Sequence, residues 1–184
     1  MSAFLSDIPV LTTQRLRLRA PVAGDWPFWR DFAATERARF IRPVEFDDGK
    51  SWRAFGHVIG HWVLRGWGSF VFTRQDDDIP LGLTGPWYPE GWPEREIGWT
   101  VWSADAEGKG YAHEAALAAR AYAFDKLGWD TAVSYIDPRN ARSIALAERL
   151  GATLDTGAIA PASDEIACLV YRHPSPAHRQ GEPA

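Results

Sequence analysis

Residues 96–127, EIGWTVWSADAEGKGYAHEAALAARAYAFDKL, carry the strongest structural signal in the chain. The segment Glu96–Trp102 predicts a strand, and the Ala-rich stretch Lys109–Leu127 predicts a long helix. Gly108 and Gly110 stand between them, where glycine lets the backbone approach a ligand closely. The first turn of a helix has N–H groups without intrahelical partners and a partial positive charge. This junction is therefore a candidate site for an anion such as a pyrophosphate.

Two better-known phosphate-binding loops do not fit this junction. A P-loop needs Gly-Lys-Ser or Gly-Lys-Thr, whereas Gly110 is followed by Tyr111. A dinucleotide-binding fingerprint needs a third glycine, and position 113 is His. The Gly-x-Gly turn alone therefore does not identify the ligand.

On either side of this junction the sequence predicts the alternating strands and helices of one α/β domain. The expected strands are Arg15–Arg19, Gly68–Thr73, Ile79–Gly85, Thr131–Ile136, Ala152–Ala160 and Ile166–Arg172. Asp25 and Asn140 are expected to cap helices, the second ending near Leu150, and a further helix is expected at about Lys50–Arg65. The proline-rich segment Pro86–Pro93 predicts irregular structure, and residues 173–184 predict a flexible tail after a core of about 11–172.

Composition excludes several classes of protein. The chain has 184 residues, of which 46% are hydrophobic and 24% charged, as expected for one folded domain spanning 1–184. The formal net charge of −4 and the lack of a basic stripe argue against a nucleic-acid partner. Cys168 is the only cysteine, so no internal disulfide forms. A signal peptide and an apolar run of about 20 residues are absent, which predicts a cytoplasmic protein away from membranes.

Two stretches, Glu96–Ala115 and Asp137–Ala152, together resemble the GNAT acetyltransferase superfamily, and most closely its branch of ribosomal-protein N-acetyltransferases. In that branch a Gly-x-Gly-Tyr-Ala turn precedes a long helix, and an Asp-Pro-x-Asn turn, a Ser and a helix ending in Leu-Gly follow. The matching residues here are Gly108-Lys109-Gly110-Tyr111-Ala112, Asp137-Pro138-Arg139-Asn140, Ser143 and Leu150-Gly151. The order and the spacing of these matches make the resemblance specific.

The resemblance implies a fold and a cofactor. The fold is a mixed central sheet flanked by helices, whose parallel strands Glu96–Trp102 and Thr131–Ile136 splay apart around the pantetheine arm of acetyl-CoA. Backbone groups of Thr100, Val101 and Trp102 would bind the pantetheine amides. N–H groups of Gly108, Lys109, Gly110, Tyr111 and Ala112 would hold the pyrophosphate. Asn140 would contact the cofactor near its thioester, a role compatible with capping a helix. No metal is expected, because His57 and His61 lack a third ligand.

The implied chemistry is direct attack of an amine on the thioester. Glu96 is the candidate general base, and the alternative interpretation is a surface carboxylate paired with Arg95. Ser143 is a candidate proton donor to the leaving sulfur, or an ordinary residue of a first helical turn. The chain departs from its relatives at Asp105, where many have Gln or Arg, and in lacking a Tyr between 141 and 150. A catalytically silent acyl-CoA-binding module is therefore the alternative function.

The acceptor amine is expected to lie between three loops. They are Arg39–Gly49, which contains Glu45, the aromatic segment Pro86–Pro93, and Ala160–Asp164. Carboxylates and aromatic rings suit a cationic amine, either a small molecule or a protein N-terminus. The ten Trp residues are compatible with an aromatic pocket and with a homodimer. The sequence leaves open whether acyl groups other than acetyl are used.

Overall fold

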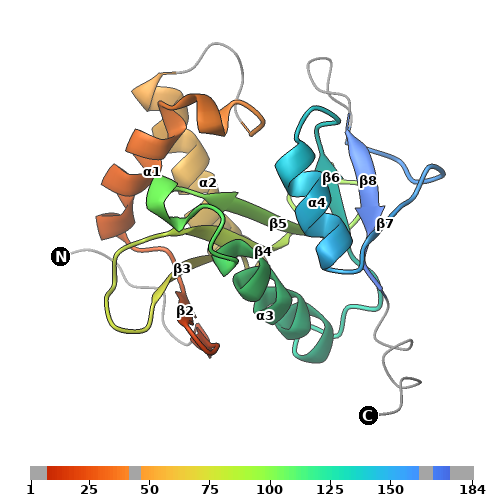
Figure 1. Cartoon of the computed structure of the whole chain (residues 1–184), viewed down its shortest axis with the longest axis horizontal. Coiled ribbons are helices and arrows are strands. Elements are labelled where there is room, and N and C mark those ends of the chain that lie inside the picture. Colours follow the sequence, from red (N-terminus) through yellow and green to blue (C-terminus); the bar gives the residue numbers. More distant parts are fainter. Residues whose placement is uncertain (1–7, 42–46, 162–167, 175–184) are drawn as a thin grey trace.

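The computed structural model describes residues 8–41, 47–161 and 168–174. In these ranges the chain forms an eight-stranded sheet with helices packed against it (Figure 1). The strands are β1 Leu11–Thr12, β2 Leu16–Arg19, β3 Phe70–Arg74, β4 Gly82–Trp87, β5 Glu96–Val101, β6 Val133–Ile136, β7 Thr153–Leu154 and β8 Leu169–Arg172. The α-helices are α1 Trp26–Ala33, α2 Asp48–Arg65, α3 Tyr111–Asp125 and α4 Ala141–Arg149, and short 3₁₀ turns η1 Ala23–Asp25, η2 Glu36–Ala38 and η3 Ala104–Ala106 connect them.

The sheet consists of two antiparallel parts joined by one parallel contact. Its strand order is β1-β2-β3-β4-β5-β6-β8-β7, and only β5 and β6 run parallel among the described neighbours. These two strands pair at a single described position, Glu96 opposite Val133. In Figure 1, β6, β7, β8 and α4 gather in one half of the view and α1 and α2 in the other. The predicted mixed sheet with two diverging parallel strands is confirmed.

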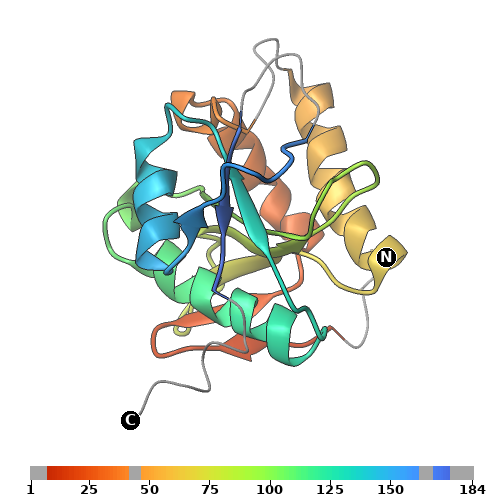
Figure 2. The same ribbon diagram turned by 90° about the vertical axis from the view of Figure 1, so that its right-hand side faces the viewer.

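Helices cover both faces of the sheet. On one face, Val71 and Leu83 pack with Trp29 of α1 and Phe55 of α2. On the opposite face, strand side chains from β2 and β3 pack against α3, whose fully buried Ala115 and Ala119 lack bulk and let the helix lie close to the strands. Figure 2 shows α2 and α4 on opposite sides of β6 and β8. None of the helices in the described ranges has the length and apolar character that a membrane crossing requires.

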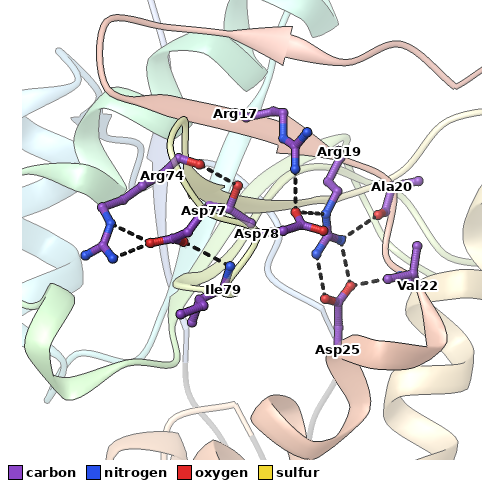
Figure 3. Close-up of polar contacts among 10 residues, drawn as sticks. Arg17, Arg19, Ala20, Val22, Asp25, Arg74, Asp77, Asp78 and Ile79 are labelled. Atoms are coloured by element: carbon purple, nitrogen blue, oxygen red, sulfur yellow. Dashed lines mark hydrogen bonds and ion pairs between the residues drawn. The ribbon is translucent and has the colours of Figure 1, made fainter.

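Asn140 caps a helix as expected, whereas Asp25 does not. Asn140 Oδ1 accepts from Ser143 N–H at 3.2 Å, and Gly66 ends α2 with φ +76°. Asp25 makes no side-chain cap to α1, and its buried carboxylate accepts two hydrogen bonds from the Arg19 guanidinium, each 2.8 Å long (Figure 3). The expected cap at Asp25 is therefore wrong, because a partly buried arginine attracts the carboxylate more strongly than the helix N–H groups do.

The acidic loop between β3 and β4 is fixed by arginines of the neighbouring strands. Asp78 accepts from Arg17 at 2.6 Å and from Arg19 at 2.7 Å (Figure 3). Asp77 accepts from Ile79 N–H at 3.0 Å and pairs with Arg74. The loop acts as a turn, and its charges are neutralised by residues of β2 and β3.

The expected bounds of three segments need correction. Pro86 and Trp87 continue β4, although the proline-rich segment predicted irregular structure. Pro86 is tolerated because β3 pairs with β4 only as far as Thr84, so the missing N–H interrupts no described bond on that side. The strand expected at 152–160 is only Thr153–Leu154. His173, expected to begin a flexible tail, is 3% exposed and belongs to the core.

Several expectations concern residues outside the described ranges. They are the loop around Glu45, the residues 162–164 of the third acceptor loop, the first residues of the strand expected at 166–172, and the tail 175–184.

Candidate active site

β5 and β6 separate just beyond their one paired position. At the base, Val133 N–H donates to the Arg95 carbonyl at 2.9 Å. One step further the Ile97 carbonyl accepts from the Ser134 hydroxyl at 2.6 Å instead of from a backbone N–H. The Ser134 side chain therefore occupies the position where a backbone hydrogen bond would otherwise join the two strands. We call the space between residues 97–101 of β5 and 134–136 of β6 the strand fork.

The register of β4 and β5 determines which backbone groups point into the strand fork. Trp102 N–H donates to the Leu81 carbonyl at 2.8 Å, in line with the pairing of Thr100 and Leu83. Opposed residues of an antiparallel pair alternate between bonded and non-bonded positions. Thr100 and Trp102 therefore direct their backbone groups toward β4, and Trp99 and Val101 direct theirs toward β6. Of the three expected pantetheine contacts, Val101 is the one oriented toward the strand fork.

The Gly-x-Gly turn has the backbone conformation that its sequence suggests. Gly108 and Gly110 adopt φ of +73° and +78°, values that side-chain-bearing residues rarely take. Gly110 occupies the N-cap position of α3 without a side-chain cap, and the first helical bond runs from Glu114 N–H to the Gly110 carbonyl. The N–H groups of Tyr111 and Ala112 come before this first bond and therefore have no acceptor within the helix. A Cβ added at Gly108 would meet no heavy atom within 4 Å, so this turn has open space beside it.

Arg15 and Glu114 fasten the turn to the sheet. Arg15 Nη1 donates to the Lys109 carbonyl at 2.9 Å, and its guanidinium lies 4.7 Å from the centre of the Tyr111 ring. Glu114 accepts from Arg15 Nε at 2.6 Å and from the Thr13 hydroxyl at 2.6 Å. Although burial opposes ionisation, these hydrogen bonds hold the pKa of Glu114 below its ordinary value. The ion pair thus connects the residue just before β2 to the first turn of α3.

Two arginines neutralise a carboxylate just before the turn. Glu107 accepts from Arg37 at 3.2 Å and from Arg142 at 2.5 Å. Arg37 also donates to the Val101 carbonyl at 3.2 Å and to the Trp102 carbonyl. Without these partners, the negative charge of Glu107 would repel an anion at the turn. Nothing in the sequence pattern pointed to Arg37 or Arg142, because Arg37 lies 70 residues before Glu107 along the chain.

Glu96 lies at the base of the strand fork with a raised pKa. Its carboxylate accepts from the Trp92 indole N–H at 2.8 Å. Burial raises the pKa of Glu96 from 4.5 to about 7, against the lowering effect of hydrogen bonds from Trp92 and the Tyr135 backbone. Arg95 lies 4.0 Å from Asp130, so the structure does not support the alternative of a surface pair between Arg95 and Glu96. A carboxyl with a pKa near neutrality is suited to accept a proton at physiological pH.

Asn140, Ser143 and Trp99 meet at the start of α4. The carboxamide oxygen of Asn140 caps the helix, as expected, and its NH₂ group is not required for that bond. The indole Nε1 of Trp99, on β5, donates to Ser143 Oγ at 3.2 Å. Ser143 acts as acceptor in this contact, so its own O–H can still donate. The contact links β5 to α4, and no local sequence pattern predicts it.

A buried chain of hydrogen bonds lies behind the fork. Ser134 donates to the Ile97 carbonyl, so at 3.0 Å it accepts from His173 Nε2–H, and His173 Nδ1 accepts from Arg120 at 3.3 Å. Arg120 also donates to the Leu150 carbonyl at 2.5 Å. Burial and the nearby Arg120 charge lower the pKa of His173 to about 3, so this ring is neutral. The chain joins α3, β5, β6 and the segment after β8.

The remaining titratable candidates have structural partners. His61 Nδ1 contacts the Trp67 carbonyl at 2.8 Å, and its Nε2 accepts from Tyr88 N–H at 3.0 Å. In the described ranges no three His, Cys, Asp or Glu residues gather as a metal site. Burial, with the charges of Glu96 and Asp137, raises the pKa of Cys168, which disfavours a reactive thiolate.

Comparisons with known proteins agree with this geometry. Residues 15–153 match the family model of the acetyltransferase (GNAT) domain. An acetyltransferase from Agrobacterium tumefaciens is 36% identical with a TM-score of 0.83, over 95% of this chain and 99% of that one. A GNAT-family acetyltransferase from Bacillus anthracis is 21% identical with a TM-score of 0.69, over 90% of this chain and 96% of that one. RimL, a ribosomal L7/L12 alpha-N-protein acetyltransferase, is 16% identical with a TM-score of 0.70, over 90% of this chain and 93% of that one. The chain therefore belongs to the GNAT acetyltransferase family and is an acyltransferase.

Proposed function

We propose that this acyltransferase moves the acetyl group of acetyl-CoA to a primary amine. The observation that supports this most strongly is the strand fork together with the uncapped first turn of α3. A diphosphate can accept hydrogen bonds from the turn 108–112 while the pantetheine arm extends into the fork. There it would meet the backbone of Val101 and Trp99, with the Asn140 carboxamide near the thioester.

The proposed reaction needs a neutral amine. Amines at a protein N-terminus have a pKa of roughly 8 and lysine amines roughly 10.4, so both need a base at neutral pH. Glu96 accepts that proton, because its pKa of about 7 leaves a large fraction ionised. The amine lone pair then attacks the thioester carbon, and the developing oxyanion accepts from a backbone N–H that β5 directs into the strand fork. The C–S bond breaks as the Ser143 hydroxyl donates its proton to the leaving thiolate, and the new amide nitrogen returns its surplus proton to the Ser143 oxygen.

The acceptor binds on the Glu96 face of β5 in this proposal. Trp92 donates to Glu96, and Trp87 stands opposite Glu96 on β4. A pocket of about 310 Å³, lined in part by Phe28, Arg37 and Trp102, lies at the other end of the strand. The aromatic side chains of Trp87 and Trp92, beside Glu96, suit an amine attached to a peptide or to a small apolar group. We favour a protein N-terminus, because its α-amine is the easier of the two to deprotonate.

The test of the cofactor site is a charge substitution at Gly108. Asn and Asp both tolerate a left-handed backbone and have the same shape, so Gly108→Asn is the matched control for Gly108→Asp. Calorimetric titration with acetyl-CoA should show saturable binding that is at least about tenfold weaker in Gly108→Asp than in Gly108→Asn. Equal binding by both variants would place the diphosphate elsewhere.

The test of catalysis is release of the CoA thiol in the presence of amines. A panel of N-terminal peptides and small amines is assayed with the wild-type protein and with Trp92→Ala. Turnover with an acceptor KM raised by Trp92→Ala supports the proposed acceptor face. Tight acetyl-CoA binding without turnover on any amine would instead indicate a silent acyl-CoA-binding module.

A further inference from the structure

Trp99 fills one side of the strand fork. Its indole N–H reaches Ser143 on α4, 44 residues away in the chain, at 3.2 Å. The ring also packs against three separate groups of buried side chains. They include Ala123 of α3, Ile136 of β6 and Leu146 of α4. One side chain therefore spans from β5 across to α4 and closes the fork on the face covered by α3 and α4.

The opposite face of β5 carries the proposed base. Side chains alternate along a strand, so Glu96, Gly98 and Thr100 share the face that Trp99 does not. Gly98 has no side chain, and a Cβ placed there would lie 3.6 Å from Glu96 Oε1. An acyl group in the fork would thus have the proposed base on one side and the Trp99 indole on the other.

We propose that Trp99 determines the length of acyl chain that the enzyme accepts and restricts it to acetyl. The inference rests on the proposed function, because it takes the acyl thioester to lie in the strand fork. The indole occupies the volume into which a longer chain would extend, and close-packed surroundings do not move aside for added methylenes. Ser143 fixes the ring orientation through the indole N–H.

Two variants separate the bulk of the ring from its hydrogen bond. Trp99→Leu removes much of the ring and keeps an apolar side chain against the three groups of buried residues. Trp99→Phe keeps a six-membered aromatic ring and, like Trp99→Leu, lacks the N–H that reaches Ser143, so the two variants differ in the bulk that they leave at this position. Thermal unfolding of both variants identifies a protein that has lost its fold, and the binding comparison uses ratios between ligands within one variant.

The experiment is calorimetric titration with CoA, acetyl-CoA, butanoyl-CoA and hexanoyl-CoA. The wild-type protein and Trp99→Phe are expected to bind acetyl-CoA at least about tenfold more tightly than butanoyl-CoA, the discrimination typical of methylenes that a pocket cannot accommodate. In Trp99→Leu that ratio should fall to about one, while the affinity for CoA itself stays within a fewfold of wild type.

Each contrary result has a distinct meaning. If the wild-type protein binds all three thioesters equally, or if Trp99→Leu keeps the wild-type ratio, Trp99 does not limit the acyl chain and the inference fails while the proposed function stands. If the wild-type protein binds neither CoA nor acetyl-CoA, the proposed function fails and the inference fails with it.

Discussion

Replacing Glu96 by Gln should make the protein more stable and much less active. Gln is nearly isosteric with Glu, and its carbonyl oxygen can accept the same bond from Trp92. The folded protein holds the pKa of Glu96 at about 7 rather than 4.5, so folding disfavours the ionised carboxylate. At 1.36 kcal/mol per pH unit, that difference corresponds to up to about 3 kcal/mol of lost stability in the wild-type protein above pH 7.

The sign of the pH dependence follows from the raised pKa. Below pH 4.5 Glu96 is protonated in the folded and unfolded states alike and has no effect. Between pH 4.5 and about 7 the unfolded state releases the proton first, so the wild-type protein loses stability relative to Glu96→Gln as pH rises. Urea unfolding of both proteins at pH 4 and pH 8 measures the difference. It should be near zero at pH 4 and favour the variant by up to about 3 kcal/mol at pH 8.

The same variant tests the base. Thiol release at saturating acetyl-CoA should fall by roughly 10²- to 10⁴-fold in Glu96→Gln. The wild-type kcat/KM should rise through a pKa near 7, and this limb should disappear in the variant. A stability difference that does not change between pH 4 and pH 8 would refute the raised pKa. Retention of wild-type activity by a folded variant would refute the role of Glu96 as base.

Three further predictions concern residues around the strand fork. Ser143→Ala should lower kcat about tenfold and leave the KM for acetyl-CoA unchanged, because a thiolate leaves readily without strong acid catalysis; a change in KM alone would instead indicate a binding role. Glu114→Gln should lower the free energy of unfolding by about 1 kcal/mol in urea at pH 7, because it removes the ion pair that joins Arg15, just before β2, to α3. The difference should shrink as pH falls through the lowered pKa of Glu114, and a loss that stays constant with pH would exclude a charge effect. Since the pKa of His173 is lowered from 6.5 to about 3, the unfolded state binds the proton first and stability falls as pH falls below 6.5. Between pH 7 and pH 5, the free energy of unfolding should fall by about 2 kcal/mol less in His173→Gln than in the wild-type protein. Equal decreases in the two proteins would contradict a neutral buried ring.

The glycine turn and the helix it precedes could be predicted from the sequence because their signals are local. Gly108 and Gly110 favour the left-handed backbone that the turn requires, and the alanines after them favour a helix that can pack closely against the sheet. The Asn140 cap and its position relative to Ser143 follow from adjacent residues in the same way.

Contacts between distant residues could not be predicted in this way. Arg37 reaches the end of β5 from a turn near the start of the chain, and Trp99 reaches Ser143 across the strand fork. Neither residue stands in a pattern that distinguishes it from an ordinary surface arginine or core tryptophan. The cap predicted at Asp25 is wrong for the same reason, because a local helix-start signal cannot reveal that Arg19 competes for the carboxylate.

The order of strands β6-β8-β7 has a consequence for synthesis of the chain. β8 follows β7 in the sequence but lies between β7 and β6 in the sheet. While the ribosome is still adding residues 169–172, β6 has no partner on that edge and β7 has nothing to join. The β6 side of the strand fork is therefore completed only after residues 169–172 have emerged and paired with β6. Truncation just before Leu169 should leave a sheet that ends at β6 with an exposed, aggregation-prone edge.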